Sequence, residues 1–495
     1  MRVQNHTFDN QALSFGLKLV IVLVLLLCTA HFGTQALVAR LYPRHIDTTE
    51  VEQQLAVIRS ARLSEEIARV SGISIANAQT ESELISPRKI ENAYIDAHIP
   101  GEGKFVGVDL VKMVVLLYED GELVESYPVV SKGVPGSPWE TPTGQYKITT
   151  KTTDHFSTIG KVHMPYSMHF FGNFFIHGWP YYPDGTLVDE GYSGGCVRMS
   201  SADAQKIFRF VDVGTPIYIY DTNDMIAGVK DPLAVKSVQA PNVSAIAYIV
   251  ADLETGDVLL EKNSERRRPI ASVTKLMTAI VANETIAYNR EVPLPYKGQK
   301  YYVNDLLYPL MLRSDNSVAN ALAAYFGDDN FISWMNQKAK ALQMNSTKFE
   351  DPSGLSYNNV STAGDLFRMA RYLYDKKEFI LAISKEKEKS IESVTGREWE
   401  MTNQNRYAGD AMFVGGKLGF TDEAKKTGLS VFAVPFGDEI RSVAVVVLGS
   451  NDWKYDSDRL LAWVQKAAEP AHDSANAGAV GAAQEGWQKI KSIFQ

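Results

Sequence analysis

Cysteine is almost absent from this sequence. Only Cys28 and Cys196 occur among 495 residues, which excludes a framework of disulfide bonds. Cys28 lies in an apolar N-terminal segment, so the remainder of the chain carries a single thiol, Cys196. A lone thiol in an oxidising compartment is prone to oxidation and mispairing. We therefore expect Cys196 to be either deeply buried or chemically used.

The sequence also lacks a basic patch. Its 50 Lys and Arg residues and 58 Asp and Glu residues give a net charge of −8 that is spread along the chain. No surface for a phosphate backbone is indicated, and we expect no nucleic-acid partner. No metal-ligand cluster stands out among the nine histidines, so we predict neither a metal nor a cofactor. His155, His163 and His169 are interpreted as structural or substrate-lining residues.

One long apolar run lies near the N-terminus, at residues 19–30, and follows Arg2 and Lys18. It is typical of an export signal. Its short apolar core favours a cleaved signal peptide, whereas the lack of a clean small-residue cleavage site favours an uncleaved membrane anchor, which we prefer. Lipidation of Cys28 is disfavoured because Leu27 precedes it, where a small residue is required.

The residue pattern changes several times after this run. Residues 47–70 have helical spacing, and Asp120-Gly121 between two β-type runs predicts a hairpin. Strand patterns at 245–263 and 429–448 enclose helical ones, which suggests one sheet assembled from distant segments. We predict a multidomain chain: an N-terminal membrane segment (1–40), a helical stalk and linker (41–102), a mostly-β domain (103–221), a linker (222–242), an α/β (α+β) domain (243–466) and a flexible tail (467–495).

A candidate cysteine site lies in the mostly-β domain. His177 precedes Cys196 by 19 positions, and Ser193-Gly194-Gly195 comes immediately before the thiol. A nearby imidazole can accept the thiol proton and pair with the thiolate. Two glycines allow a tight turn whose N–H groups point at an oxyanion, and Arg198 could hold a carboxylate. The alternative is a buried core thiol in a tight turn, with a surface histidine.

This segment resembles the L,D-transpeptidase family of the YkuD type, whose signature is a His-Gly pair, a spacer, then Ser-His-Gly-Cys with an arginine two residues later. The likeness covers about 105–220 and includes Thr-Pro-Thr-Gly at 141–144 and Met-Pro-Tyr at 164–166. We expect Gly195 to stand in place of the signature's second histidine, where it can still contribute its backbone N–H. The resemblance implies that Cys196 attacks a tetrapeptide stem at its third residue and expels D-Ala, with His177 as base. It implies substrate or oxyanion contacts by Tyr166, Gly178, Gly194, Gly195 and Arg198.

A second candidate site begins at Ser272. Ser272-Val273-Thr274-Lys275 opens an apolar helical run, and the i,i+3 spacing places the hydroxyl and the amine on one helix face. A partly desolvated lysine could act as base there, and the helix N-terminus would favour the developing alkoxide. Ser-x-x-Lys also occurs at Ser86 and Ser384, but neither begins an apolar helix. The rarer Ser314-Asp315-Asn316 follows 42 residues after Ser272 and, taken alone, could be a helix-capping turn.

Together these elements resemble the serine penicillin-recognising enzymes, and more closely the low-molecular-weight D-Ala-D-Ala carboxypeptidases and endopeptidases of the peptidase S11 type. The likeness covers about 245–448 and includes segments 351–355 and 361–363. It implies a penicillin-binding, β-lactamase-like fold in which Ser272 is acylated and Lys275 is its base. The stretch after Ser-Asp-Asn lacks Glu-x-x-Leu-Asn, which argues against a β-lactamase. Further implied site residues are Ser314, Asn316, Lys417, Gly419 and Thr421.

The third element of that family is Lys-Thr-Gly, and this chain has Lys417-Leu418-Gly419 in the corresponding context. Leu418 lacks the hydroxyl expected to bind the substrate's terminal carboxylate, a loss worth about 1 to 3 kcal/mol. Thr421 is a candidate replacement. A literal Lys426-Thr427-Gly428 lies just before the next expected strand, and we interpret it as coincidence.

We therefore expect an exported enzyme that acts on peptidoglycan stem peptides, is inhibited by β-lactams and is anchored to the cytoplasmic membrane by its N-terminal segment. A D,D-carboxypeptidase that trims pentapeptide stems generates the tetrapeptide donor that an L,D-transpeptidase consumes. One alternative is a serine domain that only holds stem peptides. Another is a cysteine domain that attaches a lipoprotein to the wall or exchanges D-amino acids.

Overall fold

The computed structural model describes residues 98–221, 232–437 and 439–470. The chain divides into two compact units, and all of these residues belong to the second, Tyr94–Gln495. The expected membrane segment, most of the expected stalk and most of the expected tail lie outside the described residues. Within those three ranges, no helix is both long and apolar enough to cross a membrane.

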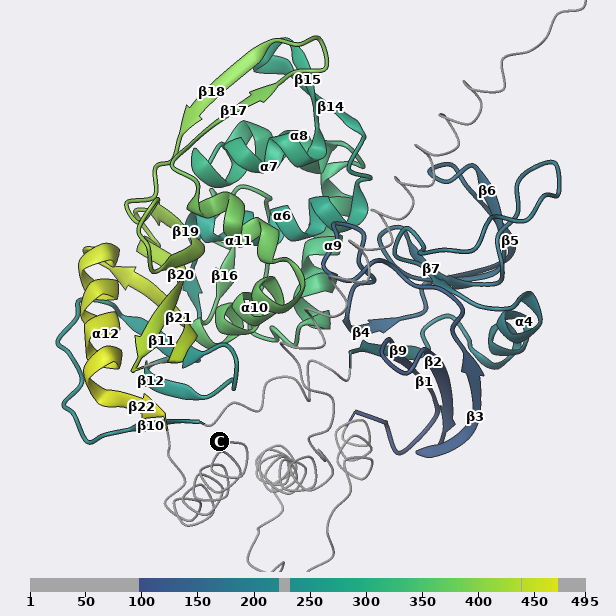
Figure 1. Cartoon of the computed structure of the whole chain (residues 1–495), viewed down its shortest axis with the longest axis horizontal. Helices are drawn as coiled ribbons and strands as arrows, with labels where there is room; N and C mark the ends of the chain where they lie inside the picture. Colours follow the sequence, from purple (N-terminus) through teal and green to yellow (C-terminus); the bar gives the residue numbers. More distant parts are fainter. Residues whose placement is uncertain (1–97, 222–231, 438, 471–495) are drawn as a thin grey trace, which may run out of the picture. The chain divides into compact units, whose positions relative to one another are not determined.

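The first domain, here called the cysteine domain (98–221), consists of two antiparallel-rich sheets and one helix (Figure 1). One sheet has the strand order β3-β2-β1-β9-β4 and the other β5-β6-β7-β8. The Asp-Gly hairpin is confirmed, because Asp120 (φ +50°) and Gly121 (φ +85°) form a two-residue turn between β2 and β3. The elements are β1 (Lys104–Asp109), β2 (Val114–Glu119), β3 (Glu122–Pro128), β4 (Gly144–Lys147), β5 (Thr150–Ser157), β6 (Val162–Phe171), β7 (Phe174–His177), β8 (Val197–Arg198), α4 (Ser201–Phe210) and β9 (Pro216–Tyr220).

The second domain, here called the serine domain (232–470), is built on a five-stranded sheet of order β12-β11-β21-β20-β19. Its central strand β21 comes from near the end of the domain and pairs with β11 from its beginning, as the separated strand patterns predicted. The strands are β10 (Leu233–Val235), β11 (Ala247–Asp252), β12 (Val258–Lys262), β13 (Arg268–Pro269), β14 (Glu291–Leu294), β15 (Gln299–Tyr302), β16 (Val360–Ser361), β17 (Glu388–Glu392), β18 (Glu398–Thr402), β19 (Phe413–Thr421), β20 (Lys425–Phe436), β21 (Glu439–Ser450) and β22 (Ala468–Pro470).

The helices of the serine domain cover both faces of this sheet. Figure 1 shows α12 on the side of the sheet opposite to α10 and α11. The helices are η2 (Ala271–Val273), α6 (Thr274–Thr285), η3 (Pro295–Lys297), α7 (Val303–Leu312), α8 (Asn316–Ala324), α9 (Asp328–Ala341), α10 (Ala363–Lys376), α11 (Glu378–Lys385) and α12 (Trp453–Ala467).

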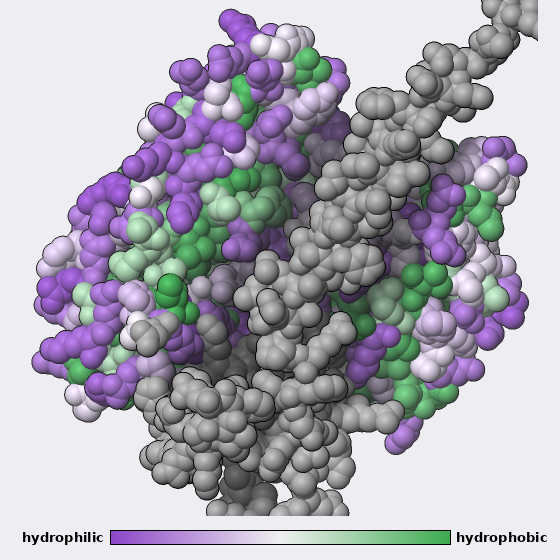
Figure 2. Space-filling model, in the orientation of Figure 1, coloured by the Kyte–Doolittle hydropathy of each residue, from purple (hydrophilic) through white to green (hydrophobic). Residues whose placement is uncertain are grey.

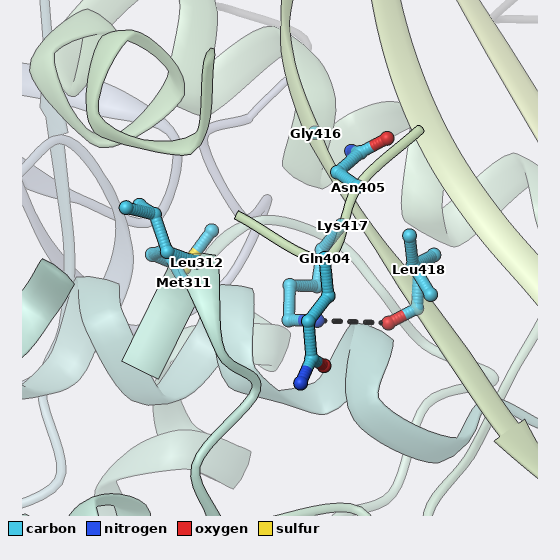
Figure 3. A pocket seen from close by; sticks show the side chains of 7 residues that line it. All are labelled: Met311, Leu312, Gln404, Asn405, Gly416, Lys417 and Leu418. Atoms are coloured by element: carbon cyan, nitrogen blue, oxygen red, sulfur yellow. Dashed lines mark hydrogen bonds between the residues drawn. The ribbon is translucent and has the colours of Figure 1, made fainter. Parts of the chain in front are cut away.

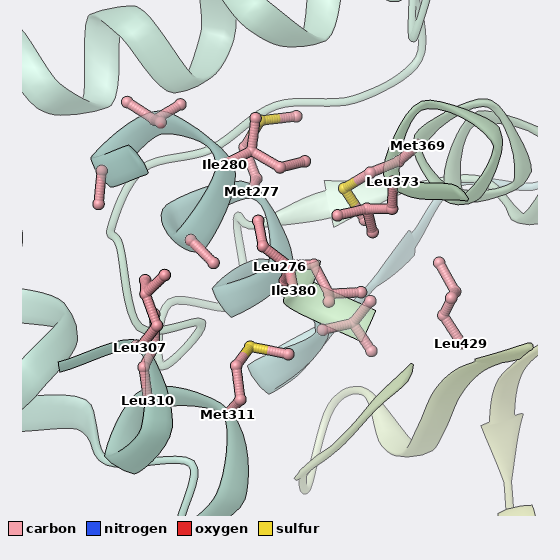
Figure 4. Packing of buried hydrophobic residues seen from close by; sticks show 14 of the residues in the cluster. Leu276, Met277, Ile280, Leu307, Leu310, Met311, Met369, Leu373, Ile380 and Leu429 are labelled. Atoms are coloured by element: carbon pink, nitrogen blue, oxygen red, sulfur yellow. The ribbon is translucent and has the colours of Figure 1, made fainter. Parts of the chain in front are cut away.

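Helix α6 lies at the centre of the larger hydrophobic core. All twelve of its residues are buried, and its Leu276, Met277 and Ile280 pack among side chains from α7, α10, α11 and β20 (Figure 4). A helix with no solvent-facing side must be surrounded by protein, and its buried Lys275 and Glu284 have polar partners there. The second core lies between the sheet and α12. The two cores together explain why β21 is a nearly continuous apolar run.

Two segments contain strands that the sequence patterns did not predict. The expected linker 222–242 contains β10, and the expected tail 467–495 contains β22. These two strands pair with each other, with Leu233 opposite Pro470. The ends of the serine domain are thus joined by a small sheet.

Candidate active sites

The candidate serine nucleophile lies where η2 is followed by α6. Ser272 lies in η2, half-buried, and Lys275 lies one turn further on in α6, fully buried. Lys275 Nζ donates to Ser272 Oγ at 3.0 Å. The predicted i,i+3 arrangement is therefore present, with the amine within proton-transfer distance of the hydroxyl.

Two further oxygens surround the Lys275 amine. Its Nζ donates to Asn316 Oδ1 at 2.6 Å and to the carbonyl oxygen of Ser353 at 2.5 Å. Burial lowers the pKa of Lys275 to about 8, and the charges of Asp351 and Asp315 act in the opposite direction. The lysine can therefore exist as a free base near neutral pH.

The Ser-Asp-Asn tripeptide is both a helix cap and a part of this site. Asp315 caps α8 by accepting from the backbone N–H groups of Ser317 and Val318. Ser314 precedes it in the left-handed region (φ +56°), a conformation that non-glycine residues seldom adopt and that is often found at functional sites. The cap orients the tripeptide so that the Asn316 side chain reaches Lys275.

Strand β19 lies directly against the nucleophile. A Cβ at Gly419 would lie 2.5 Å from the Ser272 backbone nitrogen, so only glycine permits this approach. Lys417 is buried, and desolvation with the charge of Lys275 lowers its pKa to about 7. Lys417 Nζ donates to the carbonyl oxygen of Leu418 at 2.9 Å (Figure 3). The pocket at this strand is lined by Met311, Leu312, Gln404, Asn405, Gly416, Lys417 and Leu418.

Three other residues of β19 and β20, Leu418, Thr421 and Thr427, make structural contacts. The Leu418 side chain packs against the core on the α12 side. Thr421 Oγ1 accepts from the Ala424 backbone N–H, so this hydroxyl stabilises the β19–β20 turn. Lys426-Thr427-Gly428 lies within β20, not before it as the sequence suggested. Thr427 is fully buried and its hydroxyl donates to the carbonyl of Ile270 at 3.1 Å.

Two exposed apolar residues follow the glycines that pack against the segment of Ser272. Gly354 and Gly419 both pack against the segment that carries Ser272, and the residues that follow them, Leu355 and Phe420, are 64% and 60% exposed. Figure 2 shows apolar side chains gathered in a band across the serine domain, between more hydrophilic ends. Exposed apolar groups of this kind are suited to contact a partner or substrate.

The cysteine site is assembled by the parallel pairing of β7 and β8. His177 is the last residue of β7 and pairs with Arg198, two residues after Cys196. Cys196 immediately precedes β8, and the charge of Arg198 acts on both the Cys196 thiol and the His177 imidazole, so Arg198 lies near both groups. The Cys196 Sγ donates to the carbonyl oxygen of Asn173 at 3.7 Å.

Both reacting groups of the cysteine site are neutral at rest. Burial raises the pKa of the Cys196 thiol to about 11 and lowers the pKa of the His177 imidazole to about 4. His177 Nδ1 is hydrogen-bonded to the Gly178 carbonyl oxygen at 2.6 Å, which leaves Nε2 as the proton acceptor. The resting site therefore corresponds to a thiol and a neutral imidazole.

The glycines before Cys196 differ in their surroundings. Gly195 has φ +103°, and a Cβ there would lie 2.2 Å from the Phe174 ring, so the position requires glycine. Its N–H donates to Ser193 Oγ at 3.0 Å, and this amide is thus engaged, contrary to the role expected from the sequence. Counted back from Cys196, the place of the signature's second histidine is held by Gly194 and not by Gly195 as expected, and Gly194 is exposed in open space.

Three other expected contacts lie around this site. Arg198 is half-buried, its Nε has no hydrogen-bond partner, and its guanidinium lies 5.9 Å from the Trp179 ring centroid. The Arg198 guanidinium can therefore donate hydrogen bonds to a substrate carboxylate. Gly178 packs against Ser201. Tyr166 is directed towards α4, since its hydroxyl accepts from Gln205 Nε2 at 2.6 Å.

No residue pattern predicts the two backbone carbonyls that contact Lys275 and Cys196. Ser353 contributes one to Lys275 and Asn173 contributes one to Cys196. Segment 351–355 is part of the family resemblance, but the resemblance does not predict the contact between the Ser353 carbonyl and Lys275. Within residues 98–221, 232–437 and 439–470, no cluster of three or more His, Cys, Asp or Glu side chains could hold a metal ion.

Comparison with known proteins places each site in a family. Residues 103–219 match the L,D-transpeptidase catalytic domain (YkuD), and residues 234–294 and 287–451 match the D-alanyl-D-alanine carboxypeptidase family (Peptidase_S11). The D-alanyl-D-alanine carboxypeptidase DacB2 of Mycobacterium tuberculosis is 33% identical over 212 residues, which are 39% of this chain and 71% of that protein.

Other relatives match over shorter lengths. A D-alanyl-D-alanine endopeptidase of Haemophilus influenzae is 37% identical over 166 residues, which cover 30% of this chain and 57% of that protein. The chain spans 44 to 57% of the length of the first three curated relatives. The crystal structure of a D-alanyl-D-alanine carboxypeptidase from Mycobacterium tuberculosis has 29% sequence identity and a TM-score of 0.43, covering 47% of this chain and 95% of that one. The chain thus belongs to the D-alanyl-D-alanine carboxypeptidase family through its serine domain, and its cysteine domain is a YkuD-type L,D-transpeptidase domain.

Proposed function

We propose that this chain remodels peptidoglycan at two acyl-transfer sites, a serine D,D-peptidase and a cysteine L,D-transpeptidase. One observation carries the proposal: Lys275 Nζ lies 3.0 Å from Ser272 Oγ while burial lowers the lysine pKa to about 8. A serine hydroxyl beside a lysine with a lowered pKa is an activated nucleophile, because the free amine can accept its proton.

In the serine domain, Ser272 Oγ forms a bond to the carbonyl carbon of a D-Ala residue while its proton passes to Lys275 Nζ. The amide bond to the leaving amine then breaks, and the amine takes a proton through Ser314. Water hydrolyses the resulting ester. The leaving amine is a terminal D-Ala in a carboxypeptidase and a neighbouring stem peptide in an endopeptidase, and β-lactams acylate the same serine.

In the cysteine domain, His177 accepts the proton of Cys196 as the sulfur attacks the carbonyl of the third stem residue, and D-Ala leaves. The acyl-enzyme is resolved by the side-chain amine of a diamino acid on another stem, which forms a cross-link. Arg198 supports a substrate carboxylate, since its buried Nε has no protein partner. Lipoprotein attachment and D-amino-acid exchange use the same acyl-enzyme and are alternative outcomes.

The two activities suit a single chain, because trimming a pentapeptide stem produces the tetrapeptide donor of the second reaction. Both substrates lie outside the cytoplasmic membrane. We infer that the chain is exported and that residues 19–30 hold it at the membrane.

Leu418 supports a second candidate function for the serine domain, a substrate-holding module of low activity. The leucine stands where the family has a threonine, and it packs against the core on the α12 side. Fluorescent penicillin distinguishes the two functions, because a competent site is labelled in the wild type and not in Ser272→Ala. If the hydroxyl is what limits activity, Leu418→Thr should raise kcat/KM on pentapeptides about tenfold.

The decisive experiment is mass spectrometry of muropeptides after incubation with tetrapeptide- and pentapeptide-containing stems. Cross-linked dimers should disappear only with Cys196→Ala, and pentapeptide loss or D,D-dimer cleavage only with Ser272→Ala. If the serine variant changes no product, the serine domain is a binding module. Action on tetrapeptides without shortening of pentapeptides would refute the coupling of the two reactions.

A further inference from the structure

The cysteine site is in contact with the helix that carries the base of the serine site. Helix α6 begins with Thr274-Lys275 and ends at Thr285. The residues at and just after its C-terminal end, Thr285 and Tyr288, contact the cysteine domain. At about 1.5 Å per residue, the twelve residues of α6 extend roughly 18 Å from one site towards the other.

The first contact involves the turn that contributes a carbonyl to Cys196. Asn173 accepts from the Cys196 thiol through its backbone oxygen, and its side-chain amide donates to the backbone oxygen of Thr285. At the preceding residue, Gly172, a Cβ would lie 2.8 Å from Thr285 Cγ2. The β6–β7 turn is therefore packed directly on the end of α6.

The second contact involves the segment behind Gly195. A Cβ at Gly195 would lie 3.1 Å from the backbone oxygen of Trp139, so Trp139 borders the turn that precedes the thiol. The Trp139 ring packs on that of Tyr288, with centroids 5.2 Å apart. Two segments that border Cys196, the β6–β7 turn and the segment of Trp139, thus contact residues of the serine domain.

A buried polar cluster fixes this interface. Lys338 of the serine domain is fully buried and donates to Tyr146 of the cysteine domain at 3.0 Å and to Tyr372 at 2.8 Å, and its Nζ lies 3.0 Å from Glu284 Oε1. Glu284 is the neighbour of Thr285 in α6. A buried charge that is satisfied from both sides permits few alternative geometries.

We propose that the serine domain is a structural part of the cysteine active site, in which Thr285 and Tyr288 hold Asn173 and Trp139 in the positions that orient Cys196. These four residues are positioning residues, because they act on the thiol through the backbone of the β6–β7 turn and of the Gly195 turn. Only the kinetic test of this inference rests on the proposed function of the cysteine domain.

The test uses the full chain with variants on the serine-domain side. Tyr288→Ala removes the aromatic contact, Tyr288→Phe retains it, and Tyr455→Ala is a matched control. Tyr455 is 56% exposed against 50% for Tyr288, and it lies on α12. Asn173→Ala removes the hydrogen bond to α6. Four quantities are measured: kcat and KM of the cysteine reaction, the alkylation rate of Cys196 by iodoacetamide, fluorescent penicillin labelling of Ser272, and the thermal unfolding midpoint.

We expect Tyr288→Ala and Asn173→Ala to lower kcat and to change the alkylation rate by roughly three- to tenfold. Penicillin labelling and KM should change less than twofold, and Tyr288→Phe should restore the wild-type values. The inference is overturned if Tyr288→Ala matches Tyr455→Ala in both kcat and alkylation rate. A wild-type chain without transpeptidase turnover would refute the proposed function alone, since the alkylation comparison still decides the inference.

Discussion

The lowered pKa of Lys275 makes a quantitative prediction for the serine site. If the free amine is the base and its pKa is about 8, the reactive fraction is about 9% at pH 7 and about 91% at pH 9. An ordinary lysine would be only about 0.03% neutral at pH 7. Acylation of Ser272 should therefore accelerate about tenfold between pH 7 and pH 9, with a midpoint near pH 8.

A charge-neutral substitution near Lys275 tests the cause of this profile. The charge of Asp315 raises the pKa of Lys275, so Asp315→Asn should move the midpoint to lower pH and speed acylation at pH 7. Asparagine is as good an N-cap as aspartate, which preserves the start of α8. Asp328→Asn, at the start of α9, is the control and should leave the midpoint unchanged.

The assay is the time course of fluorescent penicillin labelling between pH 6 and pH 10, with Ser272→Ala as the blank. A flat profile, or a midpoint near pH 10, would refute Lys275 as a base with a lowered pKa. An identical midpoint in the wild type and Asp315→Asn would refute the electrostatic explanation while leaving the base intact.

Three other predictions concern separate parts of the chain. Alkylation of Cys196 by iodoacetamide should accelerate steadily from pH 6 to pH 9, because the thiol pKa is about 11; a plateau below pH 7 would indicate a thiolate–imidazolium pair. Gly195→Ala should abolish the cysteine reaction and lower the unfolding midpoint, because the added Cβ would collide with the Phe174 ring. Gly194→Ala should unfold at the wild-type midpoint, because a Cβ there has no atom within 4 Å; equal midpoints for the two variants would contradict this packing. Lys417→Met should raise the free energy of unfolding at pH 7 by about 2 to 4 kcal/mol while slowing acylation. The Lys417 pKa of about 7 lies below its unfolded value of 10.5, so wild-type stability should rise between pH 7 and 10.5. Lys275 and Lys338, whose pKa values burial lowers to about 8, also contribute to this rise. The rise should therefore be smaller in Lys417→Met than in the wild type, and an equal rise would contradict the prediction.

Much of the fold could be predicted because its signals are local. The Asp-Gly hairpin is specified by two residues, and β11, β20 and β21 are apolar runs that only a buried strand explains. The β10–β22 pair could not be predicted, since three-residue strands have no periodicity and pair only after the domain has formed around them.

The candidate nucleophiles and bases could be predicted because each has a chemically distinctive side chain at a fixed spacing. The backbone groups that surround these residues could not be predicted. The carbonyls of Ser353 and Asn173 could come from any residue type, and the engagement of the Gly195 N–H depends on the Ser193 rotamer. Thr421 carries the expected hydroxyl, but only the structure shows that the turn uses it.

The strand order of the serine domain also constrains how the domain folds. The central strand β21 ends at Ser450, and its partner β11 begins at Ala247. About 200 residues must therefore be present before the sheet can close, and such non-local pairing slows folding and prolongs the exposure of apolar surface. A chain truncated before β21 would lose the whole domain, including the helix that borders the cysteine site, and not merely its last strand and helix.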